Sequence, residues 1–350
     1  MSTVDLLSMA PPEAEAFLVS IGEPKYREKQ LFSWLMKGVD FPDMANLPVS
    51  LRKKLAELSQ NRTPVVAEKQ LSKLDGTVKY LFRLIDGLCV ESVLMKYEYG
   101  YSLCISTQVG CRMGCRFCAS TLGGKVRDLL PSEMLGQIIA AERDMDVHIS
   151  HVVMMGIGEP LDNYQNVITF LKLASHPQRL GLSPRRISLS TCGVVPRILD
   201  LAKEEIPITL SVSLHASNNQ TRNEIMPINH RYPIETLLSA CKTFFEATGR
   251  RISFEYTLLS GVNDSEAVAI ELAQTLRKGL GRMPLHVNLI RLNEVKERAY
   301  ASTGEKNARA FMATLNKYGI NATLRRRLGA DVSAACGQLR AQNLEKQSQT

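Results

Sequence analysis

The chain has 350 residues, 45% of them hydrophobic and 22% charged, a composition typical of a globular protein with a full-sized core. No stretch approaches the roughly 18 consecutive apolar residues of a membrane-spanning helix, so we expect no membrane partner. The opening MSTVDLLSMAPPEAEAF lacks the basic start and apolar centre of a secretory signal, and we expect a cytoplasmic location. The net charge of +8 fits a solvated basic surface or a nucleic-acid partner, and charge alone does not decide between them.

The first 95 residues predict a small helical accessory domain followed by a connecting hairpin. Apolar residues recur at helical spacing in residues 13–21, 25–37 and 49–60. Two β-like runs, 65–71 and 78–84, then flank Asp75-Gly76, a dipeptide typical of hairpin turns.

From residue 101 onward, strand and helix patterns alternate. The β-rich runs are 101–108, 151–157, 185–191, 208–215, 252–259, 285–292 and 321–327. The helical patterns are 132–144, 164–174, 195–203, 234–247, 264–277 and 305–318. Such alternation predicts an α/β fold with parallel strands, and about six units suit an open, partial (β/α)6-type barrel whose site lies at the strands' carboxyl ends. We expect residues 96–342 to form this core and residues 343–350 to form a flexible tail.

The segment GCRMGCRFC places Cys111, Cys115 and Cys118 on one short loop directly after the first barrel strand. Three thiolates on such a loop can hold one metal centre, and glycines let the backbone turn tightly around it. A structural zinc ion needs a fourth ligand, and no nearby Cys or His has suitable spacing. Three cysteines on a four-iron cluster would instead leave one iron open. Zinc, or three structural thiols, is the alternative.

The three-cysteine loop resembles the hallmark of the radical S-adenosylmethionine (SAM) superfamily. The resemblance implies a [4Fe–4S] cluster that binds SAM and releases a 5′-deoxyadenosyl radical from it. Gly-Glu-Pro at the end of the second strand then matches the superfamily motif that contacts the amino group of SAM. Small polar residues close later strands, although any one of them could simply cap a strand end. The SAM-contacting residues would be Gly158, Glu159, Ser190, Ser213, Leu214, His215 and Asn293.

Longer segments resemble the RlmN/Cfr family of RNA adenine methyltransferases over nearly the whole chain. They are VESVLMKYEYGYSLCISTQVGCRMGCRFC, SPRRISLSTCGVVP, IMPINHRYPI, GVNDSEA and ATLRRRLGADVSAACGQLRA. The resemblance implies that Cys336 accepts a methyl group from a first SAM molecule and that a second SAM provides the radical. Glu91 would accept the proton of the substrate carbon, and Cys104 would resolve the protein–RNA adduct through a transient disulfide with Cys336. Without this resemblance, each of the two cysteines would be taken for a buried, inert thiol.

The resemblance also implies the partners, and it makes the accessory domain and hairpin of residues 1–95 a candidate RNA contact. Because Pro160 follows Gly158-Glu159, the chain resembles the enzymes that methylate carbon 2 of adenosine. Their targets are an adenosine at the peptidyl-transferase centre of 23S rRNA and the adenosine beside the anticodon in some tRNAs. Methylation at carbon 8 remains an alternative, as does a non-catalytic, zinc-holding RNA-binding protein. We expect a monomer reduced by a one-electron donor such as flavodoxin. Phosphate contacts are expected from Arg325, Arg326, Arg327 and Arg340, and structural roles from Cys89, Cys192 and Cys241.

Overall fold

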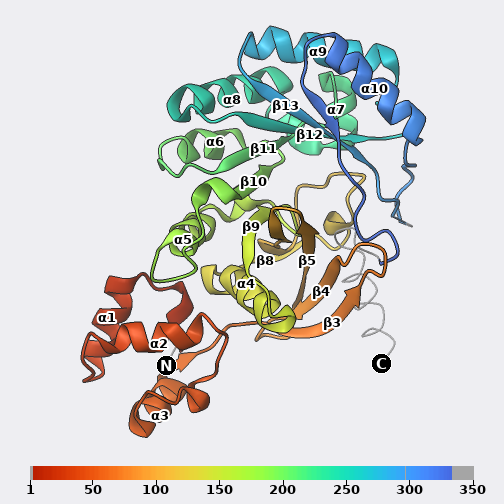
Figure 1. Ribbon diagram of the computed structural model, residues 1–350. Helices are drawn as coiled ribbons and strands as arrows, with labels where there is room; N and C mark the ends of the chain where they lie inside the picture. The colour runs from red at the N-terminus through yellow and green to blue at the C-terminus, as the bar shows by residue number, and fades with distance from the viewer. Residues whose placement is uncertain (1–2, 296, 333–350) are drawn as a thin grey trace.

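The computed structural model describes residues 3–295 and 297–332, which form a ten-stranded sheet with helices packed outside it (Figure 1). The strand order is β14-β13-β12-β11-β10-β9-β6-β5-β4-β3. From β6 to β14 every neighbouring pair is parallel, which confirms the predicted partial barrel. The parallel strands are β6 (Gly100–Cys104), β9 (Ile149–Met154), β10 (Ile187–Thr191), β11 (Thr209–Ser213), β12 (Ile252–Leu258), β13 (Leu285–Arg291) and β14 (Ala322–Leu324).

Helices connect these strands and cover the outer face of the sheet (Figure 1). The helices are α4 (Pro131–Met145), α5 (Tyr164–Ser175), α6 (Val195–Leu201), α7 (Asn219–Ile225), α8 (Ile234–Thr248), α9 (Glu266–Leu280) and α10 (Glu305–Lys317). All but α7 were predicted, because each longer helix repeats apolar residues at helical spacing and buries that face. Helix α6 is equally short but mostly apolar, whereas α7 (NQTRNEI) has Ile225 as its one apolar residue and shows no such repeat. Asn218 caps the start of α7 by accepting a hydrogen bond from the Thr221 N–H.

The predicted hairpin is an edge of the main sheet. Strands β3 (Val65–Leu71), β4 (Val78–Arg83) and β5 (Cys89–Tyr97) pair in antiparallel fashion and join the barrel through β6. Strand β5 was not predicted, because its nearly continuous buried run lacks the polar–apolar alternation of a half-exposed strand. The loop after β6 adds a small sheet of β7 (Gln108–Gly110) and β8 (Lys125–Asp128).

The N-terminal helices form a body below the barrel in Figure 1. They are α1 (Pro11–Ser20), α2 (Arg27–Leu35) and α3 (Val49–Leu58), with a two-stranded pair of β1 (Val4–Asp5) and β2 (Ser59–Gln60). Short 3-10 turns are η1 (Leu6–Ser8), η2 (Phe41–Asp43), η3 (Ala119–Thr121), η4 (Pro160–Asn163), η5 (Pro184–Arg186) and η6 (Pro227–His230). The division of the chain at residues 95 and 342 stays a prediction.

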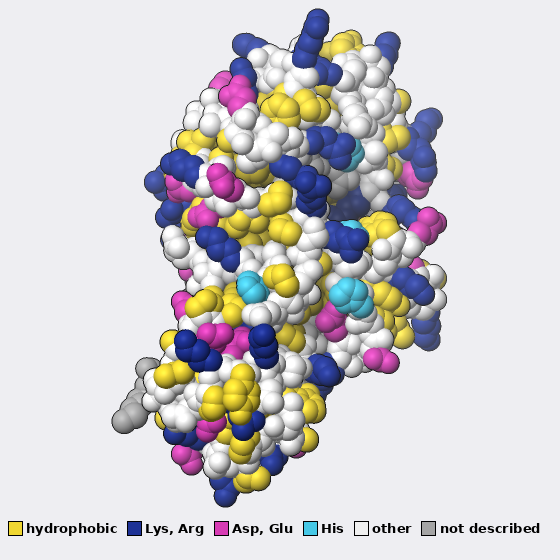
Figure 2. Space-filling model, turned by 60° about the vertical axis from the view of Figure 1, so that its left-hand side comes forward, with side chains coloured by type: hydrophobic (Ala, Val, Ile, Leu, Met, Phe, Trp, Pro, Cys, Tyr) yellow, Lys and Arg dark blue, Asp and Glu magenta, His cyan; other side chains and the backbone are white. Residues whose placement is uncertain are grey.

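Positive charge is spread over the surface of the molecule. On the face in Figure 2, Lys and Arg side chains gather around a recess in the upper half. Within residues 3–295 and 297–332, no helix is long and apolar enough to cross a membrane.

A buried ion pair joins the N-terminal body to the barrel. Arg179, after α5, donates to Glu28 of α2 at 2.7 Å, and both side chains are almost fully buried. The guanidinium also lies 3.4 Å from the centre of the Phe32 ring. A buried charge without its partner is costly, so this pair holds the two parts together.

We therefore expect Glu28→Gln to lower the free energy of unfolding by about 3–5 kcal/mol, because Arg179 would keep a buried, unpaired charge. Urea denaturation measures the change. Glu23→Gln, which removes a looser pair with Arg27 at 3.9 Å, is the control and should cost less than about 1 kcal/mol. Equal losses in the two variants would contradict the role of the pair.

Candidate active site

A cavity of about 300 Å³ opens at the carboxyl ends of the parallel strands, and we call it the cysteine cavity. The structure brings together here most of the predicted site residues, which come from the ends of β10 and β11 and from the loops after β7, β9, β11 and β13. Those that line it are Cys111, Cys115, Cys118, Gly158, Glu159, Ser190, Ser213, His215 and Asn293. Leu214 does not line it, because its side chain is fully buried in the main hydrophobic core.

The cysteine loop is shaped by glycines and by hydrogen bonds. Gly110 and Gly114 have φ angles of 81° and 72°, which favour glycine. The Thr121 hydroxyl donates to the carbonyl oxygens of Cys115 and Cys118, at 3.1 and 3.0 Å. Because the backbone is held in this way, the three side chains lie along one wall of the cavity.

The chemistry of these thiols fits a metal centre. Burial raises the pKa of Cys111 to about 12 and raises the pKa of Cys115 further. The negative charge of a neighbouring thiolate, such as Cys118, raises both pKa values as well. Binding of a metal centre would therefore displace protons from these side chains. Among the described residues, no three His, Cys, Asp or Glu side chains are grouped as ligands of a single ion. The three cysteines line a shared wall, which suits the wider [4Fe–4S] cluster.

Glu159 is fixed at the end of the second barrel strand. One carboxylate oxygen accepts from the Cys192 N–H at 2.7 Å and the other from the Leu161 N–H at 3.0 Å. Burial raises the pKa of Glu159, and these two backbone donors lower it in part. The carboxylate is aligned on the cavity wall before any ligand binds. A cationic ligand group would offset the cost of burying its charge.

His215 is a neutral imidazole in this site. Its Nδ1 accepts from the Thr257 N–H at 2.9 Å, so Nε2 carries the proton. Burial, helped by the charge of Arg222, lowers the pKa of His215 to about 3. The ring meets Phe117 of the cysteine loop edge to face, at 5.0 Å between centroids. His215 therefore connects the fourth barrel strand to the cysteine loop without adding charge.

Several residues of the site were not predicted from the sequence. Glu255 and Thr257 of β12 line the cysteine cavity, and Cys192, predicted to be structural, lines it too. Burial raises the pKa of Glu255, and the charge of Arg325 lowers it in part. The sequence signal that could have identified Glu255 and Thr257 is the alternation of polar and apolar residues in ISFEYTL. Both faces of a strand inside a parallel sheet are covered, so its polar residues face the interior of the protein.

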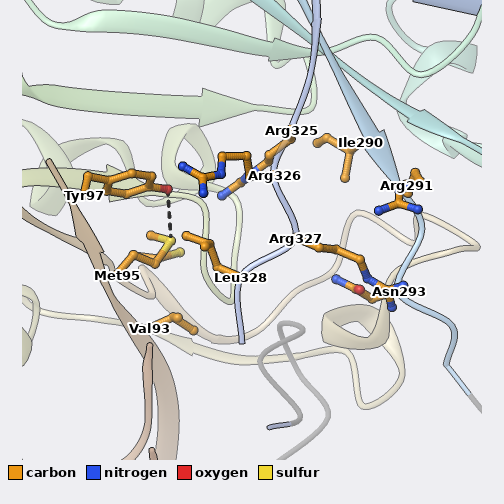
Figure 3. Close-up of a pocket in the computed structure, with 11 residues that line it drawn as sticks. Val93, Met95, Tyr97, Ile290, Arg291, Asn293, Arg325, Arg326, Arg327 and Leu328 are labelled. Atoms are coloured by element: carbon orange, nitrogen blue, oxygen red, sulfur yellow. Dashed lines mark hydrogen bonds between the residues drawn. The ribbon is translucent and has the colours of Figure 1, made fainter. Parts of the chain in front are cut away.

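A second cavity adjoins the first and shares Ile290, Asn293 and Arg325 with it. We call it the arginine cavity, and Figure 3 shows its lining. Its described lining residues are Val93, Met95, Tyr97, Cys104, Ile290, Arg291, Asn293, Arg325, Arg326, Arg327 and Leu328. The predicted arginines follow the end of β14 at Leu324, so the segment crosses the cavity as an irregular chain.

Cys104 lies in the wall of the arginine cavity and is 6% exposed. Its neighbours are Val93 and Met95 of β5, and Leu328 packs against this small cluster. Cys336 and Arg340 lie outside the described residues. Leu328, which packs in the cluster around Cys104, is nevertheless only eight positions before Cys336 in the sequence.

Glu91 lies on β5 and lines neither cavity. Its carboxylate is buried and forms an ion pair with the buried Lys79 of β4 at 3.1 Å. Alternation along β5 places Glu91 on the same face as Val93, which is paired with Cys104. Glu91 and Cys104 therefore share one face of the sheet.

The end of the described chain is held by the β3–β4 turn. Asp331 accepts from the Ser72 hydroxyl at 2.6 Å and from the Lys73 N–H at 2.8 Å. The Gly329 N–H donates to Asp75 at 2.7 Å. These contacts fix the chain five positions before Cys336.

Comparison with known proteins agrees with this fold and site. Residues 105–273 match the Radical SAM superfamily, and residues 4–60 match the ribosomal RNA large subunit methyltransferase N-terminal domain. A crystal structure of a radical SAM methyltransferase from Sphaerobacter thermophilus has a TM-score of 0.91 and 39% identity, covering 96% of this chain and 98% of that one.

The fold and the three-cysteine loop define a radical SAM protein. Curated relatives named probable dual-specificity RNA methyltransferase RlmN are similar over their full length. The Lachnospira eligens protein is 49% identical, covering 97% of both chains, and the Clostridium acetobutylicum protein is 48% identical, covering 98% of both. The chain belongs to the RlmN family.

The tight approach at Gly158 gives a test of the site's architecture. Gly158 has a φ of 111°, and a Cβ there would lie 2.6 Å from Cβ of Gln108. We expect Gly158→Ala to destabilise the protein by about 2–4 kcal/mol, through overpacking and an unfavourable backbone angle. Gly123→Ala is the control, since nothing lies within 4 Å of a Cβ at that position. Thermal unfolding measures both variants, and equal midpoints would mean that the contact with Gln108 does not constrain position 158.

Proposed function

We propose that this chain methylates carbon 2 of an adenosine in 23S rRNA and of the adenosine beside the anticodon in tRNA. The observation that carries the proposal is the junction of the two cavities. The cysteine cavity and the arginine cavity share Ile290, Asn293 and Arg325 in their linings, so the cavity that Cys104 lines adjoins the one that the cysteine loop lines. A reaction that needs a cofactor, a thiol and RNA can therefore take place in one continuous space.

Cys111, Cys115 and Cys118 would hold the [4Fe–4S] cluster. Glu159 would bind the amino group of SAM, and the other SAM contacts would be Gly158, Ser190, Ser213, Leu214, His215 and Asn293. When bound, cluster and SAM supply one-electron chemistry that can remove a hydrogen atom from an unactivated methyl group.

The residues of the chain would provide positions and protons. Cys336 would carry the methyl group taken from one of two SAM molecules, so that the carbon reaches a base carbon that is a poor target for ordinary methylation. Glu91 would accept the proton from that base carbon, beside the ammonium group of Lys79. Cys104 would attack the sulfur of Cys336, so that a Cys104–Cys336 disulfide forms as the bond between that sulfur and the RNA-bound carbon breaks. The carbon would take up a proton and leave as the methyl group of the RNA, and two electrons from the donor system would reduce the disulfide.

The target base has to leave its stack to reach this space. The cavities lie within the curve of the sheet, so an adenine in a helix cannot enter them without being extruded. Single-stranded or loop adenosines are therefore the favoured substrates, and RNA shape contributes to recognition. The arginines around the opening would bind the flanking phosphates.

Nucleoside mass spectrometry tests this proposal. Unmodified 23S rRNA and tRNA treated with reconstituted enzyme, reductant and SAM should yield 2-methyladenosine. Cys336→Ala should abolish the product, because no acceptor for the first methyl group remains, and Cys104→Ala should leave protein covalently attached to RNA. Cys89→Ala, at the start of β5, is the control and should retain turnover. If 8-methyladenosine is the sole product, the choice of carbon 2 is wrong.

The β3–β4 turn should position the methyl-carrying segment. Asp75→Ala removes the acceptor of the Gly329 N–H, and we expect methyl transfer to RNA to slow about 5- to 10-fold while SAM cleavage without RNA stays unchanged.

Asp86→Ala is a matched control for Asp75→Ala. Asp86 accepts from the Leu88 N–H at 3.1 Å, as Asp75 accepts from the Thr77 N–H at 3.0 Å, but its second oxygen pairs with Arg127. Equal slowing in both variants would mean that turn stability, and not the contact to Gly329, sets the rate.

A further inference from the structure

Three aromatic side chains form a patch beside the arginine cavity, and we call Tyr97, Tyr99 and His151 the aromatic patch. The rings of Tyr97 and Tyr99 are stacked, with centroids 4.9 Å apart and planes 8° from parallel. His151 meets Tyr99 at 4.8 Å with an interplanar angle of 67°. Tyr99 is still 61% exposed, so most of its ring is open to another planar group.

The fold of the β5–β6 hairpin does not require an aromatic residue at position 99. Tyr97 pairs with Gly100 across the two-residue turn, and Gly100 takes the unusual φ of 118°. Short polar residues and glycine are the usual occupants of such a turn. The turn itself therefore does not need the ring of Tyr99, and the exposed part of that ring is available to bind a flat group.

The aromatic patch continues into the arginine cavity. Tyr97 lines that cavity, and its hydroxyl donates to the sulfur of Met95 at 3.6 Å (Figure 3). The charge of Arg325, which also lines that cavity, lowers the pKa of the Tyr99 hydroxyl in part, so an arginine of the cavity lies near the patch. The patch therefore lies on the path from the surface to Cys104.

The charge of this region selects the kind of partner. The described residues that line the arginine cavity include four arginines and no acidic residue. Arg326 and Arg327 are exposed, so they can meet a ligand from solution. Flat aromatic rings next to guanidinium groups suit single-stranded nucleic acid, because bases stack on the rings and phosphates pair with the arginines.

We propose that the aromatic patch binds an unpaired nucleotide adjacent to the target adenosine, with its base stacked on Tyr99 and its phosphate held by Arg326 or Arg327. This inference rests on the proposed function and assigns a binding site for the neighbouring base. Stacking is tolerant of sequence, since every base has a flat face. One such site could therefore serve RNA targets with different neighbouring bases.

Fluorescence of 2-aminopurine tests the site directly. The probe is an unmodified 23S rRNA fragment with 2-aminopurine on one side or the other of the target adenosine. Wild-type protein should quench one of the two probes, because stacking on Tyr99 replaces contact with water. Tyr99→Phe, which keeps the ring, should quench it equally, and Tyr99→Ala should not.

The same variants should differ in RNA affinity. We expect Tyr99→Ala to raise the RNA dissociation constant and the KM on the order of 10-fold, with a smaller change in kcat. SAM cleavage without RNA should be unchanged in this variant. Tyr318→Ala, a 44% exposed tyrosine at the end of α10, is the control for loss of a surface ring and should bind like wild type.

The outcomes separate the two proposals. If Tyr99→Ala binds RNA and quenches the probe as wild type does, the aromatic patch is not a nucleotide site. If wild-type protein itself neither binds nor methylates the RNA fragment, the proposed function fails first.

Discussion

The carboxyl ends of parallel strands meet at one edge of a sheet, and the site depends on this constraint. Residues as distant in sequence as Cys111 and Asn293 line one cavity because the chain segments that follow the parallel strands β6 and β13 start from the same edge of the sheet. The glycines of the cysteine loop then turn the backbone so that three sulfurs share one wall. Buried groups such as Glu159 and His215 are held by backbone donors before any ligand arrives. The site is therefore organised by the fold itself.

The second feature is the antiparallel extension of the sheet, which carries further ionisable groups and a turn that holds the end of the described chain. Strands β3, β4 and β5 carry Lys79, Glu91 and the turn that contacts Asp331. The curled sheet places this edge opposite the segment after β14, so the two ends of the sheet face each other across the arginine cavity. The segment that leads towards Cys336 therefore reaches the surroundings of Cys104 at Leu328.

Much of this could be predicted from the sequence. The parallel strands and longer helices follow from periodicity, and the cysteine loop from its spacing. Leu214 stays a predicted SAM contact, but its side chain packs in the core, since a strand-end motif does not reveal which side chain turns inward. Glu255 was missed because a polar residue within a strand can also face solvent. Strand β5 was missed because continuous burial removes the alternation that marks a strand. These errors concern tertiary packing, which local patterns do not encode.

The most direct test of the proposed chemistry concerns the cysteine loop. Protein reconstituted with iron and sulfide in the strict absence of oxygen should be brown, contain about four irons per chain, and release 5′-deoxyadenosine from SAM on reduction. Replacement of Cys115 by alanine should remove both colour and product. A colourless wild-type protein that binds one zinc ion, or one that never releases 5′-deoxyadenosine, would contradict the assignment of the cysteine loop to a radical SAM cluster.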